Sequence, residues 1–235
     1  MTKPVMDAAE AVAPIFDGAT VMISGFGGSG APIELVHALI DQGAKGLTVV
    51  NNNAGTGMVG LAALIREGRV DKVICSYPRT SDARAFTERY LAGEIALELV
   101  PQGVLAERIR AAGAGMPAFY TRTAAGTELA EGKEQREIDG VLYVMERWLK
   151  ADFALVKADC ADLAGNLTYR LSARNFAPIM CMAADTAIVQ AREIVPMGGV
   201  DPAVVVTPGI FVDRLVKVAA PAQEELLVNA GASYP

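Results

Sequence analysis

The first half of the sequence alternates short apolar segments with amphipathic segments of helical length. The apolar segments are nearly unbroken and rich in β-branched residues, as buried strands are. Buried strands joined by helices are typical of a parallel sheet with both faces covered, so we expect an α/β fold with a mostly parallel sheet flanked by helices. The predicted strands are residues 20–24, 47–51, 73–76 and 95–100, and the predicted helices are 33–42, 58–66, 82–91 and 104–112.

The second half is less regular. Residues 119–132 are rich in Gly, Thr and Ala and predict a loop excursion or a small subdomain. Further strands are expected at 141–145, 153–157, 167–170 and 215–218, with a helix at 175–184. The pattern weakens at the end of the chain, so we predict one α/β domain over residues 1–220 and a tail, partly disordered, over 221–235.

Composition excludes several classes of function. The net charge of -6 comes without a basic stripe, which argues against nucleic-acid binding. No apolar run reaches about 18 residues, and Met1-Thr2-Lys3-Pro4 lacks the apolar core of a signal peptide, so a cytoplasmic location without membrane contact is expected. Buried free thiols are expected at the three cysteines, Cys75, Cys160 and Cys181. With a single histidine in the chain, no metal site is expected.

The four predicted strands of the first half all end in polar residues or glycine. In a parallel sheet these ends lie along one carboxyl edge, where open α/β folds bind ligands. The sequence therefore predicts a crevice surrounded by a glycine loop, an amide cluster and a lone glutamine. The strand ends are Ser24-Gly25, Asn51-Asn52-Asn53, Ser76-Tyr77-Pro78 and Pro101-Gln102-Gly103.

The glycine run lies between the first strand and the first helix. Its backbone can approach a ligand closely, and the helix N-terminus that follows favours an acidic or phosphate group. A nicotinamide dinucleotide requires an acidic residue about 20 positions later, where this chain has asparagines, and a nucleoside triphosphate loop requires a lysine that is absent. A tight turn without ligand is the other alternative. The run is Gly25-Phe26-Gly27-Gly28-Ser29-Gly30-Ala31-Pro32.

The amide residues each have a structural and a functional interpretation. Asn52 and Asn53 could stabilise a turn or cap a helix, or they could bind a substrate carboxylate or carbonyl. Gln102 could be an ordinary turn residue or a preorganised donor to an oxyanion. His37 lies off the apolar stripe of its helix and is expected at the solvated surface, as is the charged run 131–137. No residue has the setting of a nucleophile, which indicates a ligand-binding platform without its own reactive group.

Six motifs together resemble the A (α) subunits of family I 3-oxoacid CoA-transferases, in the order of that family. Ser24 replaces the first of the family's paired glycines. The resemblance covers nearly the whole chain and implies the CoA-transferase (NagB/RpiA-like) fold. The motifs are the segment 17–32, Asn52-Asn53-Ala54-Gly55, the segment 101–110 (PQGVLAERIR), the segment 115–121, Gly165-Asn166-Leu167-Thr168-Tyr169-Arg170 followed by 173–176, and the segment 207–212 (TPGIFV).

The resemblance implies a site shared with a B subunit that carries the catalytic glutamate, in an A2B2 heterotetramer. It implies ping-pong transfer of CoA from succinyl-CoA to a 3-oxoacid, with CoA and succinyl-CoA as substrates and no permanently bound cofactor. Gln102 would stabilise the oxyanion, and Asn52 and Asn53 would line the acyl pocket. Gly25, Phe26, Gly27, Gly28, Ser29, Gly30 and Ala31 would lie against CoA.

The most detailed prediction concerns the identity of the acceptor acid. The segments 151–157 and 175–180 favour a 3-oxoadipate enzyme of aromatic catabolism, in the β-ketoadipate pathway. Acetoacetate or acetate as acceptor is the alternative. An acyl-CoA or sugar-phosphate sensor on the same scaffold is the non-enzymatic alternative, although no DNA-binding segment is visible.

Overall fold

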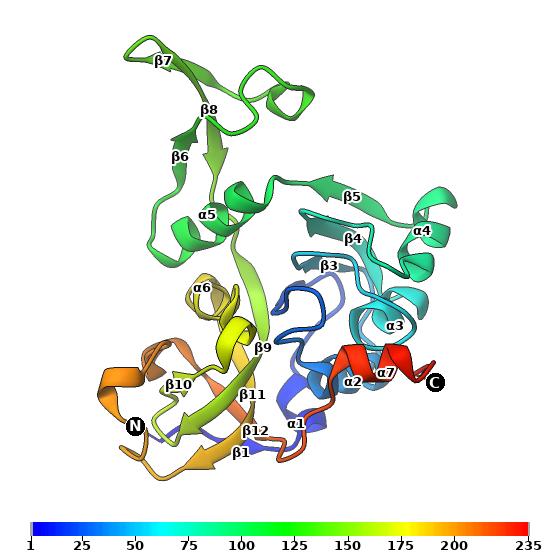
Figure 1. Cartoon of the computed structure of the whole chain (residues 1–235), viewed down its shortest axis with the longest axis vertical. Coiled ribbons are helices and arrows are strands. Elements are labelled where there is room, and N and C mark those ends of the chain that lie inside the picture. The colour runs from blue at the N-terminus through cyan, green and yellow to red at the C-terminus, as the bar shows by residue number, and fades with distance from the viewer. Residues whose placement is uncertain (1, 235) are drawn as a thin grey trace.

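The computed structural model describes residues 2–234, and its centre is a nine-stranded sheet (Figure 1). Eight strands follow the order β1-β12-β11-β9-β2-β3-β4-β5 with all neighbours parallel, and β10 pairs antiparallel with β9. The predicted mostly parallel sheet is confirmed. The strands are β1 (Val5–Met6), β2 (Thr20–Ile23), β3 (Leu47–Val50), β4 (Val70–Cys75), β5 (Ala96–Leu99), β9 (Ala151–Asp162), β10 (Leu167–Thr168), β11 (Ala184–Val195) and β12 (Arg214–Lys217).

Helices cover both faces of the sheet, and each face has its own apolar core. Successive residues of β2 point to opposite faces, so Val21 and Ile23 enter one core while Met22 enters the other. The first core packs under α1 (Ala8–Val12), α2 (Ile33–Gln42), α3 (Gly60–Arg66) and α4 (Arg84–Leu91). The second packs under α5 (Gln102–Gly113) and α6 (Ala177–Ala183).

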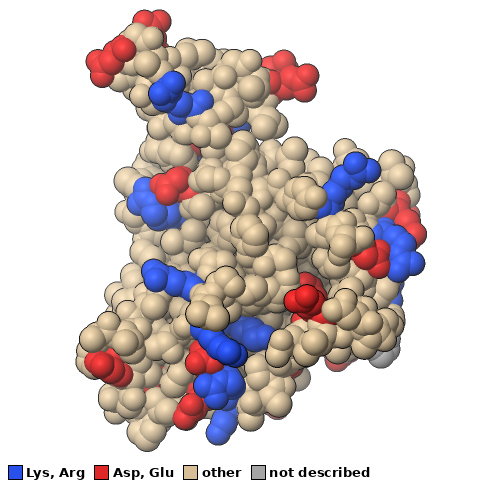
Figure 2. Space-filling view, viewed as in Figure 1, with Lys and Arg blue, Asp and Glu red and all other residues tan. Residues whose placement is uncertain are grey.

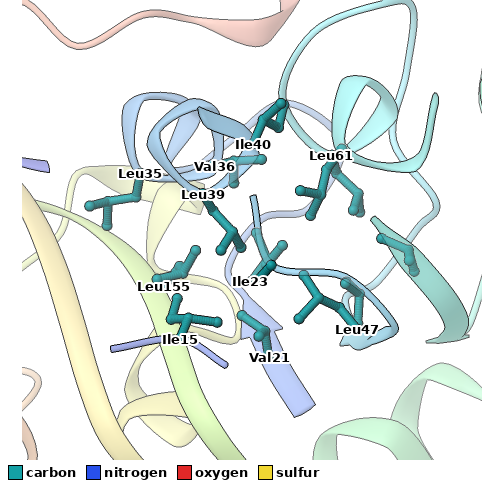
Figure 3. Packing of buried hydrophobic residues seen from close by; sticks show 14 of the residues in the cluster. Ile15, Val21, Ile23, Leu35, Val36, Leu39, Ile40, Leu47, Leu61 and Leu155 are labelled. Atoms are coloured by element: carbon teal, nitrogen blue, oxygen red, sulfur yellow. The ribbon is translucent and has the colours of Figure 1, made fainter. Parts of the chain in front are cut away.

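The first core fixes the position of α2 above the strands. Leu39 of α2 points toward Ile23 and Leu155 of the sheet (Figure 3), and Leu35 belongs to the same buried cluster. All four side chains are at most 2% exposed. Because α2 begins at the end of the glycine run, its burial also fixes the base of that loop.

The second half departs from the sequence prediction at β11. This interior strand pairs with β9 and β12, yet the sequence pattern predicts no strand there. Its sequence, ADTAIVQAREIV, mixes charged and polar residues with the apolar ones. The polar Gln190 is buried because its amide donates to Glu34 and accepts from the Leu35 backbone N–H. A buried polar side chain with partners interrupts the apolar pattern that predicts strands.

A three-stranded antiparallel sheet projects from the main body (Figure 1). It consists of β6 (Ala118–Thr121), β8 (Val141–Arg147) and β7 (Gln135–Ile138), with the 3-10 helix η1 (Glu128–Ala130) in the connection. The small subdomain predicted at 119–132 is thus part of an arm. The charged run 131–137 is largely exposed, as expected, but it ends in the strand β7.

The predicted tail is ordered into a helix, α7 (Glu224–Asn229), which lies beside α2 and α3 in Figure 1. The apolar pattern does not predict this helix, because the one residue that it buries, Glu224, is polar. Within residues 2–234, no helix combines the length and the apolar character needed to cross a bilayer. Short 3-10 helices η2 (Leu171–Arg174), η3 (Pro202–Val204) and η4 (Gly209–Phe211) complete the chain.

Candidate functional site

A cavity lies at the carboxyl ends of β2, β3 and β4 and the start of α5, where the sequence predicts a crevice. Its volume is about 680 Å³. On the face in Figure 2, Lys and Arg residues lie below the middle of the molecule and an acidic group lies to the right of it, while residues of other kinds cover the area above them. The lining contains neither Lys nor Arg among the described residues; it consists of Phe26, Gly27, Gly28, Asn52, Asn53, Thr56, Ser76, Tyr77, Thr80, Ser81, Gln102, Glu224, Glu225, Val228 and Asn229.

The three asparagines after β3 are all buried but have different partners. Asn51 donates from Nδ2 to the Ile23 carbonyl over 2.7 Å, and its Oδ1 accepts from the Asn53 backbone N–H. Asn53 Oδ1 accepts from the Gly55 N–H over 2.7 Å. Both side chains therefore serve the turn, as in the structural interpretation, although Asn53 also lines the cavity.

Asn52 is the asparagine whose side chain meets other cavity residues. Its Oδ1 accepts from Gln102 Nε2 over 2.9 Å and from Ser76 Oγ over 2.7 Å. The structure thus joins Asn52 and Gln102, two residues that the sequence predicts separately. Gln102 is exposed on the first turn of α5, two residues before the predicted helix start. An amide nitrogen carries two hydrogens, so the second can still be donated to a ligand.

The glycine run divides into a tip and a base. The tip, Phe26, Gly27 and Gly28, lines the cavity, and Phe26 and Ser29 close a tight turn through mutual backbone hydrogen bonds. Gly27 has a φ of +58°, which favours glycine. Phe26 is 49% exposed, so an aromatic face is available at the mouth of the cavity.

The base of the run faces Asn175 and the adjoining η2 segment instead of the cavity. The Gly25 N–H donates to Asn175 Oδ1, and Asn175 Nδ2 donates to the Ser29 carbonyl. A methyl group on Gly30 would collide with the Ala173 carbonyl oxygen. Gly25, Ser29, Gly30 and Ala31 are therefore absent from the lining, although all are predicted to lie against the ligand.

Ser24 has a structural role where the family pattern has glycine. Its side chain is fully buried, and its Oγ donates to the Gly30 carbonyl over 2.8 Å. The Lys157 backbone N–H donates to the same oxygen over 3.2 Å. The serine thus ties both ends of the glycine loop's base to β9.

Ser76 and Tyr77 follow β4 and line the cavity at the sheet edge where the sequence predicts them. The sequence missed the part of the lining that α7 supplies. Nothing in the sequence indicated that Glu224 and Asn229 of α7 would complete the wall. Glu224 is 5% exposed, and burial raises the pKa of its carboxyl group from 4.5 to about 7.

The remaining candidates have structural settings. The prediction that His37 is solvated is wrong: its Nε2 accepts from the Gly60 N–H, its ring stacks on Tyr234 at 3.9 Å, and burial lowers its pKa. All three cysteines are free, and two of them are buried. Burial raises the pKa of Cys75 to about 11 and that of Cys181 to about 12, so both are protonated and unreactive at neutral pH.

No three His, Cys, Asp or Glu side chains within residues 2–234 gather as metal ligands would. The cavity instead presents neutral amide and hydroxyl groups along one side and two glutamates along the other. Neutral donors held by buried hydrogen bonds suit carbonyl and carboxylate oxygens.

Comparison with known sequences gives one family over most of the chain. Residues 5–218 match the coenzyme A transferase family. The chain is 57% identical to the A subunit of 3-oxoadipate CoA-transferase from Pseudomonas putida, covering 93% of this chain and 94% of the relative. It is 50% identical to the A subunit of succinyl-CoA:3-ketoacid coenzyme A transferase from Xanthomonas campestris, covering 93% and 90%.

Comparison with solved structures finds the same fold. Glutaconate coenzyme A-transferase from Acidaminococcus fermentans superimposes with a TM-score of 0.82 at 23% identity, covering 93% of this chain and 78% of the other. The Escherichia coli acyl-CoA transferase YdiF gives a TM-score of 0.81 at 24% identity, covering 94% of this chain and 48% of the YdiF chain, so this chain spans about half of that protein.

Proposed function

This chain belongs to the coenzyme A transferase family, and we propose that it is the A subunit of an enzyme that moves CoA from succinyl-CoA to 3-oxoadipate. Its relatives are named as A subunits, which implies that a B subunit is the partner. The 57% identity to a 3-oxoadipate enzyme supports this acceptor over acetoacetate. The pair would assemble as an A2B2 heterotetramer and act in aromatic catabolism.

The proposed chemistry proceeds through a glutamate of the B subunit. Its carboxylate attacks the thioester carbonyl of succinyl-CoA, which forms a mixed anhydride and releases the CoA thiolate. The thiolate attacks the anhydride on the glutamyl carbonyl, which gives an enzyme–CoA thioester and free succinate. The same two steps then run in reverse with the acceptor carboxylate in place of succinate, which gives the acceptor–CoA thioester and restores the glutamate. Each exchange is thereby divided into two steps with smaller barriers.

Gln102 is the residue of this chain that would stabilise the charge formed in these steps. Each attack places negative charge on a carbonyl oxygen, which a preorganised neutral donor stabilises without titrating. One Nε2 hydrogen of Gln102 is used by Asn52, which fixes the amide plane and leaves the second hydrogen for the oxyanion. Asn52 would thereby position Gln102, while Asn53 lines the acyl pocket.

The tip of the glycine run would lie against CoA. Gly27 has no side chain and nothing lies within 4 Å of where one would begin, which lets a ligand approach the backbone, and the exposed ring of Phe26 offers an apolar surface for the pantetheine arm. In this proposal the base of the run, including Gly25 and Gly30, supports the tip through Asn175 and does not touch CoA.

The observation that supports the proposal most is the bonded Asn52–Gln102 pair on a cavity at the carboxyl edge of a CoA-transferase fold. Its test is to purify the complex of this chain with its B subunit, then to compare kcat/KM for 3-oxoadipate and acetoacetate. A higher value for 3-oxoadipate is expected. A higher value for acetoacetate would replace the acceptor. Tight CoA binding without any exchange would favour the non-enzymatic sensor.

A further inference from the structure

The C-terminal helix α7 forms one wall of the cavity although it lies beyond the part of the chain that matches the family. Its ends are fastened to the body by side chains of other elements. Before the helix, Lys157 Nζ donates to the Ala222 carbonyl over 2.9 Å, and the Ala222 N–H donates to Glu34 Oε1 over 2.6 Å. After it, the Tyr234 N–H donates to the Met58 carbonyl and the Tyr234 hydroxyl donates to Asp41. The helix is therefore held in place as a wall.

Glu224 is the buried residue of this wall, at 5% exposure. A methyl group on Gly28 would lie 3.3 Å from its Oε2, and one on Gly60 would lie 3.4 Å from its Oε1, so the carboxyl group fits between two glycines. Within residues 2–234, no hydrogen bond reaches either carboxyl oxygen. A buried carboxyl group at a cavity without a protein partner is available to a ligand.

The charged groups on the surrounding elements do not neutralise Glu224. On α2, Glu34 accepts from Gln190 and Ala222, and His37 accepts from Gly60. Lys157 of β9 bonds the Ala222 carbonyl, and Arg66 of α3 bonds Glu67, Ser233 and the Tyr234 carbonyl. Glu225 on α7 itself is exposed. Burial alone raises the pKa of Glu224 to about 7, so near neutrality a large fraction of it carries a proton.

A protonated carboxyl group changes what the cavity can bind. Among the described residues, the lining offers no Lys or Arg to a second carboxylate on the substrate, whereas a carboxylic acid can donate one short, charge-assisted hydrogen bond to it. Dicarboxylic acyl groups, such as succinyl and 3-oxoadipyl, carry such a second carboxylate. A substrate with one carboxyl group, once joined to CoA, carries none.

We propose that Glu224 is a specificity-determining residue whose protonated carboxyl donates a hydrogen bond to the free carboxylate of a dicarboxylic acyl substrate. The proposal rests on the CoA-transferase function. It predicts that ionisation of Glu224 opposes binding, because two carboxylates would then face each other in a buried site. Dicarboxylic acids are therefore bound with proton uptake above about pH 7 and lose affinity as the pH rises.

The test uses three variants of this chain, each purified in complex with the B subunit: Glu224→Gln, Glu224→Ala and, as a control, Glu88→Gln. In a ping-pong enzyme, kcat/KM for the acceptor reports on the acceptor half-reaction, so 3-oxoadipate and acetoacetate are compared from about pH 6 to about pH 9. In the wild type, the ratio of the two values falls up to about tenfold per pH unit above neutrality.

The variants separate a hydrogen-bond donor from other roles. Glu224→Gln keeps a donor of the same shape and flattens the pH dependence of the ratio. Glu224→Ala lowers the ratio at about pH 6 by roughly ten- to a hundredfold. Glu88→Gln removes the same charge from an exposed position on α4, outside the cavity lining, and keeps the wild-type pH dependence. Calorimetry of adipate binding in buffers of different ionisation enthalpy shows proton uptake for the wild type and none for Glu224→Gln.

Two results would overturn the proposal. An unchanged pH dependence in Glu224→Gln means that another group sets the ratio, and complete loss of exchange in Glu224→Gln with all acids means that Glu224 reacts covalently instead of donating a hydrogen bond. Failure of the proposed function looks different, since the wild-type complex would then transfer CoA to neither acid. Thermal unfolding of each variant shows whether the fold is retained.

Discussion

The two walls of the cavity differ in how the chain holds them. The wall at the sheet edge consists of loops whose side chains bond buried backbone groups, as Asn51 does with Ile23 and Asn53 with Gly55. The opposite wall is the six-residue helix α7, which buries only Glu224 and is fastened at its ends. Side chains on loops that are bonded to a packed core are held in one geometry. Side chains on a helix that is fastened only at its ends can be replaced by others without altering the core. The difference fits the two proposed roles, chemistry at the first wall and substrate selection at the second.

The largest effect is expected from Gln102→Ala, which removes the proposed oxyanion donor from the sheet-edge wall. Turnover should fall about 10²–10³-fold while the fold is retained. Steady-state kinetics of the complex and thermal unfolding check both parts, with Gln135→Ala on the exposed strand β7 as a matched control. A fall of less than about threefold would make Gln102 an ordinary residue of the helix start.

The rigidity of the sheet-edge wall is tested by Gly55→Ala. Gly55 has a φ of +81°, and a methyl group there would lie 2.8 Å from Ala62 Cα. The unfavourable φ costs about 1–2 kcal/mol, and the collision adds about 1–3 kcal/mol. Gly126→Ala is the control, because Gly126 has a φ of +74° but nothing within 4 Å. Each kcal/mol of lost stability lowers Tm by about 2–4 °C. An equal fall in Tm in both variants would show that the loop around Gly55 shifts to make room for the methyl group.

The α7 wall predicts a pH-dependent stability. The pKa of Glu224 is raised from 4.5 to about 7 in the folded protein, so its contribution to stability is present below 4.5 and is lost as the pH rises through about 7. The free energy of unfolding of Glu224→Gln, taken relative to that of the wild type, should therefore increase by on the order of 2 kcal/mol between about pH 5 and about pH 8. Chemical denaturation at both pH values measures it. A difference independent of pH would mean that Glu224 is not buried.

The smallest effect is expected where α7 is fastened. Tyr234→Ala removes the ring stacked on His37 and the hydroxyl bonded to Asp41, but leaves the backbone bond to Met58. The stacked pair contributes about 0.5–1.5 kcal/mol to holding α7 in place. Its loss should therefore raise KM for 3-oxoadipate about two- to tenfold and leave kcat unchanged. If kcat fell instead, α7 would belong with the chemical wall.

The same contrast explains what the sequence could predict. The helix predicted at residues 33–42 is α2 with these bounds, because a complete apolar stripe faces the core. The crevice followed from strand ends that lie on one edge. The strand β11 and the helix α7 were missed, since Gln190 and Glu224 are polar side chains buried by partners or cavities far away in the sequence. Which asparagine supports the turn and which meets other cavity residues likewise depends on the positions of Gln102 and Ser76, which lie far from the asparagines in the sequence.

Completion of the site by a second polypeptide is tested most directly by measuring CoA exchange in three samples: this chain by itself, the B subunit by itself, and the two together. Exchange from succinyl-CoA to 3-oxoadipate is expected only in the mixture, because the lining supplied by this chain holds donors for an oxyanion and no proposed nucleophile. Transfer by this chain by itself at the rate of the mixture would contradict a shared active site.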